Sequence, residues 1–137
     1  MSVWTHVAGI IRVDSIRRIE NELDFDKILG KEWDFNDMWD DEPIYTEYIT
    51  FPNRFMPSGS EGSLHKHVWI NPDKQDMSSY TVSVFGDLRD YEDAQSIVDW
   101  FEECCDELWI RQATIIVNVS GKETVNYIYK GRSDNYV

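Results

Sequence analysis

The chain has 137 residues, of which 42% are hydrophobic and 14% aromatic, and its 26 acidic against 13 basic residues give a net charge of −13. This length suits one domain over residues 1–137, and the composition is too apolar for a disordered acidic segment. Because DNA and RNA are bound mainly through cations that meet phosphates, the charge argues against direct nucleic-acid binding. It disfavours anionic membrane surfaces for the same reason.

The first residues, MSVWTHVAGI, lack the basic and apolar regions of a signal peptide. No apolar run reaches the roughly twenty residues of a membrane span. Cys104 and Cys105 are the only cysteines, and neighbouring cysteines rarely satisfy disulfide geometry. We therefore expect a reduced, cytoplasmic protein.

The first half of the chain predicts a strand, a helix and a long insert. Residues 3–13 are β-branched and aromatic, as in a strand. A helix should follow and stop near Gly30, because apolar residues recur at helical spacing (Ile16, Ile19 and Leu23). Residues 31–57 interleave acids with aromatic residues and predict an insert with one short strand around 44–51. Residues 58–63, SGSEGS, are a loop by composition.

The second half predicts two strands, a helix and a hairpin, with strands over 64–70, 79–86, 111–119 and 124–130. Asp90 and Asp93 resemble a helix N-cap and its N3 acid. The helix behind them has one apolar stripe, made of Ala94, Ile97, Val98, Phe101, Cys104, Cys105 and Leu108. This order predicts an α+β fold: a ferredoxin-like split βαβ sandwich with an antiparallel sheet, two helices on one face and an extra C-terminal strand.

The negative charge is concentrated in the predicted helices and the insert. Residues 14–48 hold twelve acids and four bases, and residues 87–107 hold nine acids and one base. One interpretation is an acidic helical face that binds a basic partner, and the other is a solvated helix exterior. The acids predicted to bind the partner are Asp93, Asp99, Glu102, Glu103, Asp106 and Glu107.

Strand alternation places another set of side chains on the sheet face opposite to the helices. All three histidines fall there beside aromatic rings, a mixture that can stack on a base or hold a peptide. Alternatively, the aromatic insert folds over this face. The candidate ligand-binding residues are Trp4, His6, His65, His67, Trp69 and Phe85.

The chain carries no recognisable catalytic motif. His65 and His67 have the spacing of two ligands on a strand, but zinc takes three or four ligands, so no metal site is assigned. The acids of residues 34–41 fail the EF-hand pattern, because Met38 and Trp39 stand where an oxygen ligand and a glycine are needed. The SGSEGS loop lacks the lysine of a P-loop and the glycine spacing of a dinucleotide loop. We predict no cofactor and assign no catalytic residue.

Three segments resemble small uncharacterised proteins of bacteriophages and prophages: MSVWTHVAGIIRVD, MPSGSEGS and YTVSVFGDLRDYED. The most distinctive part is residues 85–91. The resemblance brings no established activity and no catalytic residue. It implies a context in which small acidic proteins bind host proteins, including enzymes that act on nucleic acids.

These observations give three hypotheses for the function. In the first, the chain is a non-enzymatic interaction protein that binds a host protein through its acidic helical face. In the second, the histidine-bearing sheet face and the SGSEGS loop bind a small ligand or nucleotide, with a hydrolase as the enzymatic form. In the third, the chain is a structural component of a phage.

Overall fold

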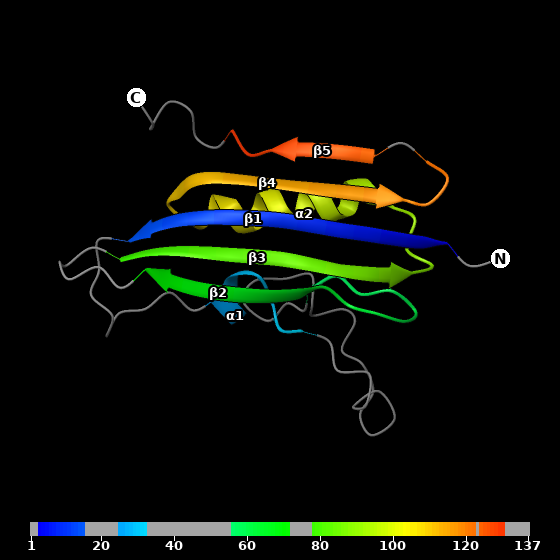
Figure 1. Ribbon diagram of the computed structural model, residues 1–137, viewed down its shortest axis with the longest axis horizontal. Helices are drawn as coiled ribbons and strands as arrows, with labels where there is room; N and C mark the ends of the chain where they lie inside the picture. The colour runs from blue at the N-terminus through cyan, green and yellow to red at the C-terminus, as the bar shows by residue number, and fades with distance from the viewer. Residues whose placement is uncertain (1–2, 16–24, 33–55, 72–77, 123, 131–137) are drawn as a thin grey trace, which may run out of the picture.

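The structure, a computed structural model, describes residues 3–15, 25–32, 56–71, 78–122 and 124–130 (Figure 1). They form a mixed α+β fold with one five-stranded antiparallel sheet and helical structure on one side of it. The strands are β1 (Trp4–Ser15), β2 (His65–Asn71), β3 (Ser78–Arg89), β4 (Ile110–Val119) and β5 (Thr124–Ile128). The helices are α1 (Phe25–Ile28) and α2 (Ala94–Asp106). The predicted α+β class is confirmed, and so are the five strands predicted outside the insert.

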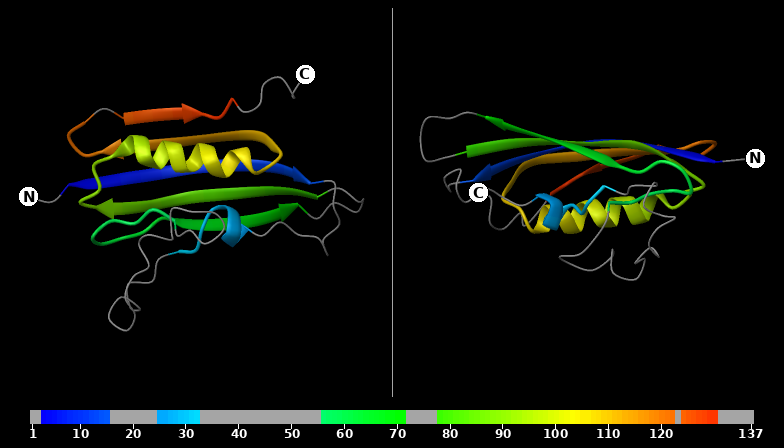
Figure 2. Two further views of the ribbon diagram at one scale, coloured as in Figure 1. Left: turned by 180° about the vertical axis from the view of Figure 1, so that it is seen from behind. Right: turned by 90° about the horizontal axis from the view of Figure 1, so that it is seen from below.

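The sheet has the strand order β2-β3-β1-β4-β5, and every neighbouring pair is antiparallel. Strand β1 is central and pairs with β3 from Trp4↔Arg89 to Ser15↔Ser78. The helices lie on one face of the sheet, as the edge-on view in Figure 2 shows. None of the described helices covers the other face.

The hydrophobic core lies between α2 and the sheet. Alternate residues of β1, including Val7 and Ile11, are buried, whereas His6, Ala8 and Ile10 between them are exposed. The same alternation holds on the neighbouring strands, where Tyr80, Val82, Val84, Ile115, Val117 and Val119 are buried. Strand alternation predicts that these side chains face the helices, and their burial confirms the predicted assignment of faces.

The N-cap of helix α2 lies three residues after Asp90, the residue predicted to be the cap. This N-cap is Asp93, whose side chain accepts a hydrogen bond from Ser96 N over 3.2 Å. Asp90 instead adopts a left-handed conformation with φ 59°, a geometry that Asp tolerates better than most residues. Sequence spacing alone placed the cap on the wrong one of two acids, because the turn after β3 decides which acid precedes the helix.

The buried face of α2 matches the predicted apolar stripe and also includes Trp100, which the stripe left out. Trp100 Nε1 donates to Leu29 O over 3.0 Å, and this bond satisfies the one polar group of a buried indole. Cys104 and Cys105 are both buried and unoxidised, as expected for thiols on an apolar stripe. No described helix has the length and apolar character that crossing a membrane requires.

The predicted first helix and the insert lie only partly within the described residues. Helical structure is described over Phe25–Ile28, and Gly30 follows with φ 103°, consistent with the predicted stop. At the far end of the insert, Met56 N donates to Lys31 O over 2.8 Å. Residues 16–24 and 33–55, including the strand predicted around 44–51, lie outside the described residues.

Candidate functional site

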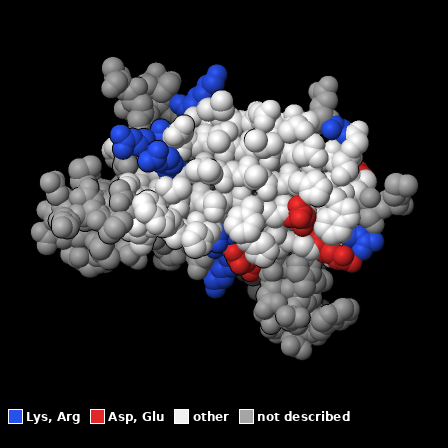
Figure 3. Space-filling model, viewed as in Figure 1, with Lys and Arg blue, Asp and Glu red and all other residues white. Residues whose placement is uncertain are grey.

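The sheet face opposite to the helices, called here the open face, carries most of the exposed large apolar side chains of the described residues. Five of six such side chains lie on it: Ile10, Trp69, Phe85, Ile116 and Ile128. The sixth, Trp109, follows α2. Trp69 is 53% exposed and Ile128 is 65% exposed. Uncharged side chains form most of this face (Figure 3). The gathering of these side chains on one sheet face makes it a candidate interaction surface.

Strand register shows how these side chains are arranged. His65 of β2 lies opposite Phe85 of β3, and their ring centroids are 5.9 Å apart. Phe85 lies opposite Ala8 of β1, which in turn lies opposite Ile116 of β4. The small side chain of Ala8 therefore separates two larger apolar groups in one row across the sheet.

All six residues predicted to bind a ligand lie on the open face, but they do not converge on one point. His6 is on β1, and β3 separates it from His65 and His67 on β2. His6 Nδ1 lies 2.6 Å from Asp87 Oδ1, and His65 Nδ1 lies 3.4 Å from Glu32 Oε2. Within the described part of the chain, no three His, Cys, Asp or Glu side chains come close enough to hold a metal ion.

Glu32 lies beside β2, at the edge of the sheet. Its Oε1 accepts a hydrogen bond from Lys66 N over 2.9 Å. Burial raises the pKa of Glu32, but the bonds from Lys66 N and His65 outweigh this effect and hold the pKa below its ordinary value. The carboxylate is therefore stabilised in its charged form at this edge.

All six acids predicted to bind a partner are exposed on the outer side of α2. Besides Asp93, which accepts from Ser96 N, three of them accept hydrogen bonds that the sequence did not predict. Glu102 Oε2 accepts from Tyr127 Oη over 2.5 Å, Asp106 Oδ1 accepts from Tyr129 Oη over 2.6 Å, and Asp99 accepts from the Gln95 amide. The acidic surface is thus partly anchored to β5 and to the chain that follows it.

A groove of about 540 Å³ lies between α2 and β5. It is lined by Glu102, Asp106, Asn126, Tyr127, Ile128, Tyr129 and Lys130. Sequence analysis missed this site because it assigned no role to the last strand. The available signal was the alternation over residues 126–129, which directs both tyrosines toward the helical side.

Two ionisable groups near the groove have pKa values above their ordinary values. Burial raises the pKa of the Tyr127 phenol, and the hydrogen bond to Glu102 and the charge of Glu102 raise it further. Burial also raises the pKa of the Cys105 thiol, helped by Cys104 and by nearby acids. A buried thiol with a raised pKa is a poor nucleophile, so Cys105 supports no covalent catalysis.

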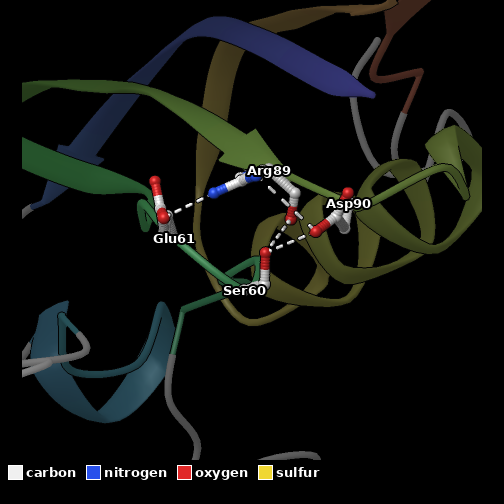
Figure 4. Close-up of polar contacts among 4 residues, drawn as sticks. All are labelled: Ser60, Glu61, Arg89 and Asp90. Carbon is white, nitrogen blue, oxygen red and sulfur yellow. Dashed lines mark hydrogen bonds and ion pairs between the residues drawn. The ribbon is translucent and has the colours of Figure 1, made fainter. Parts of the chain in front are cut away.

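The SGSEGS loop is fixed against the end of β3. Ser60 N donates to Arg89 O over 2.8 Å, and Arg89 N donates to Glu61 O over 2.9 Å. Side chains reinforce the contact, as Figure 4 shows: Ser60 Oγ donates to Asp90 Oδ2 over 2.7 Å, and Arg89 Nη1 lies 2.5 Å from Glu61 Oε1. The Ser60 amide is used within the protein, and the loop is a structural contact rather than a free connector.

Two glycines allow the loop to approach β3 this closely. Gly62 has φ +78°, and a Cβ at this position would lie 2.0 Å from Asp87 O. A Cβ at Gly59 would lie 2.3 Å from Arg89 O. Residues 59–62 and 87–90 are therefore in direct contact.

Gly62→Ala should destabilise the protein more than Gly121→Ala. Both glycines have positive φ, but a Cβ at Gly121 would meet nothing within 4 Å. The backbone conformation costs both variants about 1–2 kcal/mol. The clash with Asp87 O should add about 1–3 kcal/mol for Gly62→Ala alone. Urea unfolding of the two variants measures the difference, and equal losses would show that the loop does not press on β3.

Tyr127→Phe should change how stability depends on pH. Because the pKa of Tyr127 is raised in the folded protein, its contribution is complete below about pH 10, where an unfolded tyrosine ionises, and is lost at higher pH. The variant should lose up to about 1 kcal/mol at neutral pH with the bond to Glu102. Its stability should then decline less steeply above about pH 10. Urea unfolding of the variant and the wild type at neutral pH and above about pH 10 tests this. Equally steep declines in stability for the two proteins would contradict it.

The described geometry thus offers three surfaces: the open face, the acidic side of α2 and the groove between α2 and β5. Comparison with family models, with curated proteins and with solved structures finds no match to this chain.

Proposed function

We propose that this chain is a non-enzymatic interaction protein that binds a basic protein surface through the acidic side of α2. The observation that carries the proposal is the exposure of six acids on a stretch, residues 93–107, that contains no Lys or Arg. Charge of one sign on one surface steers an oppositely charged partner and disfavours partners of the same sign.

The positions of these acids argue against a role in solubility alone. Four of the six, Glu102, Glu103, Asp106 and Glu107, lie in the second half of the helix or directly after it. The C-terminal end of a helix is the negative end of its dipole, so acids in the last turn are unfavourable by about 0.3–1 kcal/mol each. The two pairs four residues apart also repel each other. Acids at the N-terminal end would have given the same net charge without these costs.

The phage resemblance suggests the kind of partner. In that context, the basic surface belongs to a host protein, and an enzyme that handles nucleic acid carries such a surface where it binds phosphates. An acidic helix of fixed shape competes for that surface. We also propose the ferredoxin-like split βαβ arrangement for this fold, supported by the position of β1 between β3 and β4 and of β3 between β1 and β2.

Reversing two acids of α2 should weaken the captured complex. Asp99→Lys with Glu107→Lys leaves the N-cap Asp93 and the tyrosine-bound acids unchanged. A partner captured from bacterial lysate would be identified and purified, and its Kd measured at two salt concentrations. The double variant should weaken binding about tenfold or more at low salt, and added salt should weaken the wild-type complex.

The matched control adds two cations away from α2, as Gln112→Lys with Ser120→Lys, and is compared with Asp99→Asn with Glu107→Gln, which raises the net charge by the same two units. Both positions are exposed. This control should change the Kd less than threefold, because the charge lies outside the contact. Equal losses in the two double variants would mean that net charge alone governs capture, and the proposed surface would be wrong.

A second candidate function is the stacking of a planar ligand on the open face. It is favoured by the adjacent rings of His65 and Phe85 and by the exposed Trp69 on the same strand as His65. Rings on a sheet surface can stack on nucleobases without any preference for sequence. If two copies instead associate through this face, as a structural phage component requires, light scattering will detect the assembly.

Titration with AMP tests this second candidate. Binding should shift the backbone amide NMR signals of β2 and β3, and Trp69→Ala should weaken it about tenfold, since a stacked base contributes about 1–3 kcal/mol. Trp109→Ala is the matched control, because Trp109 is 77% exposed but lies outside the strands, between α2 and β4. An absence of shifts at millimolar AMP, or equal losses in both variants, would rule out stacking on this face.

A further inference from the structure

The outer edge of β5 is open among the described residues. Strand β5 stands at the end of the sheet order and pairs only with β4. Tyr129 N donates to Ala113 O over 3.0 Å, and this bond fixes which residues face β4. In an antiparallel pair, alternate residues direct both backbone groups outward. Thr124, Asn126 and Ile128 therefore present their N–H and C=O groups to the open edge.

The opposite edge of the sheet, at β2, is partly covered by another segment of the chain. At β2, the Glu32 carboxylate accepts from the backbone amide of Lys66, and Lys66 Nζ donates to Gly30 O over 3.0 Å. The chain that follows α1 therefore covers part of that edge. An edge with unpaired backbone groups is a template for another strand, and proteins usually protect it. In the described part of this chain, only the β2 edge has such protection.

The groove between α2 and β5 lies directly beside the open edge. A strand added to β5 would direct alternate side chains to opposite faces of the sheet. One set would lie on the helical side, next to the carboxylates of Glu102 and Asp106. The other set would lie on the open face, next to Ile128. The tyrosine hydroxyls that donate to both carboxylates hold the acidic groups in position on the helical side.

We infer that β5 accepts an extended segment of the partner in which basic and apolar residues alternate. This inference rests on the proposed function and names how the partner is held: its backbone pairs with β5, and its basic side chains meet Glu102 and Asp106. Backbone pairing supplies affinity, and the alternate side chains supply specificity. A second copy of this chain fits less well, because β5–β5 pairing would bring four of these carboxylates together.

The test uses the full chain and the peptide Lys-Val-Lys-Val-Lys-Val-Lys, with binding measured by calorimetry. Asn126→Pro removes an outward N–H without removing a bond to β4, because proline is tolerated where the edge faces solvent. It should weaken binding about tenfold. Asn126→Ala removes the same side chain but keeps the outward N–H, so it should bind the peptide more tightly than Asn126→Pro does. Amide NMR signals of β4 show whether the hairpin is retained in both variants.

Removing the charge of the groove provides a second measurement. Glu102→Gln with Asp106→Asn keeps acceptors for both tyrosines but removes two charges, and it should weaken binding about tenfold at low salt. Asp87→Asn with Glu92→Gln removes two exposed acids that lie outside the groove and outside the six acids of the proposed contact, and it should change the Kd less than twofold. A peptide of the same composition with its lysines in one block should bind more weakly than the alternating one, and so should the alternating peptide with N-methylated amides.

Several results would overturn the inference. Unchanged peptide binding by Asn126→Pro, with the hairpin retained, would show that the edge is not used. A dimer that Asn126→Pro dissociates would show that a second copy occupies the edge. If partner capture still depends on Asp99 and Glu107 in either case, the proposed function stands and only the role of β5 is wrong. If capture is independent of those acids while the peptide tests succeed, the proposed acidic surface fails and the edge remains a peptide site.

Discussion

Strand β1 is paired on both sides, and this central position determines what every other surface can do. A strand that is hydrogen-bonded to β3 and β4 must place its side chains alternately on the two faces. The side chains of Val7 and Ile11 lie on the face covered by α2, so the side chains of Ala8 and Ile10 lie on the opposite face. With α1 and α2 both on the buried side, the apolar groups of the open face are left without a described cover. The exterior of α2 is then the surface on which acids can gather.

Alternation and helical spacing predicted the strands, the faces of the sheet and the buried side of α2, because these depend on neighbours along the chain. The same local patterns could not decide between Asp90 and Asp93 as the cap, since the turn after β3 sets that choice. They also could not show that the SGSEGS loop lies against Arg89 and Asp90. The groove was missed for a similar reason: Tyr127 and Glu102 come together only when β5 joins the sheet.

The acids of α2 show how a surface can be selected against local stability. The last turn of a helix favours cations, yet residues 103, 106 and 107 are acidic, and the side chain of Tyr127 is held beside Glu102. Hydrogen bonds from tyrosines recover part of this cost on the side toward β5. They also fix the direction of two carboxylates, whereas Glu107, the C-cap residue, has no such described bond from β5. A fixed carboxylate discriminates between partners better than a mobile one does, because its geometry is set before binding.

Acidic side chains lie at both edges of the sheet, and their different contacts there bear on which partner the chain can bind. At β2, Glu32 satisfies an outward amide and keeps its own charge because its pKa is lowered. At β5, the acids lie beside the edge, and among the described residues none bonds to the outward backbone groups of Asn126. The same carboxylates then have two opposite effects. They repel a second acidic copy of the chain that would extend the sheet, and they attract a basic strand. Discrimination between partners generally needs both a favourable and an unfavourable contact, and here Glu102 and Asp106 provide both.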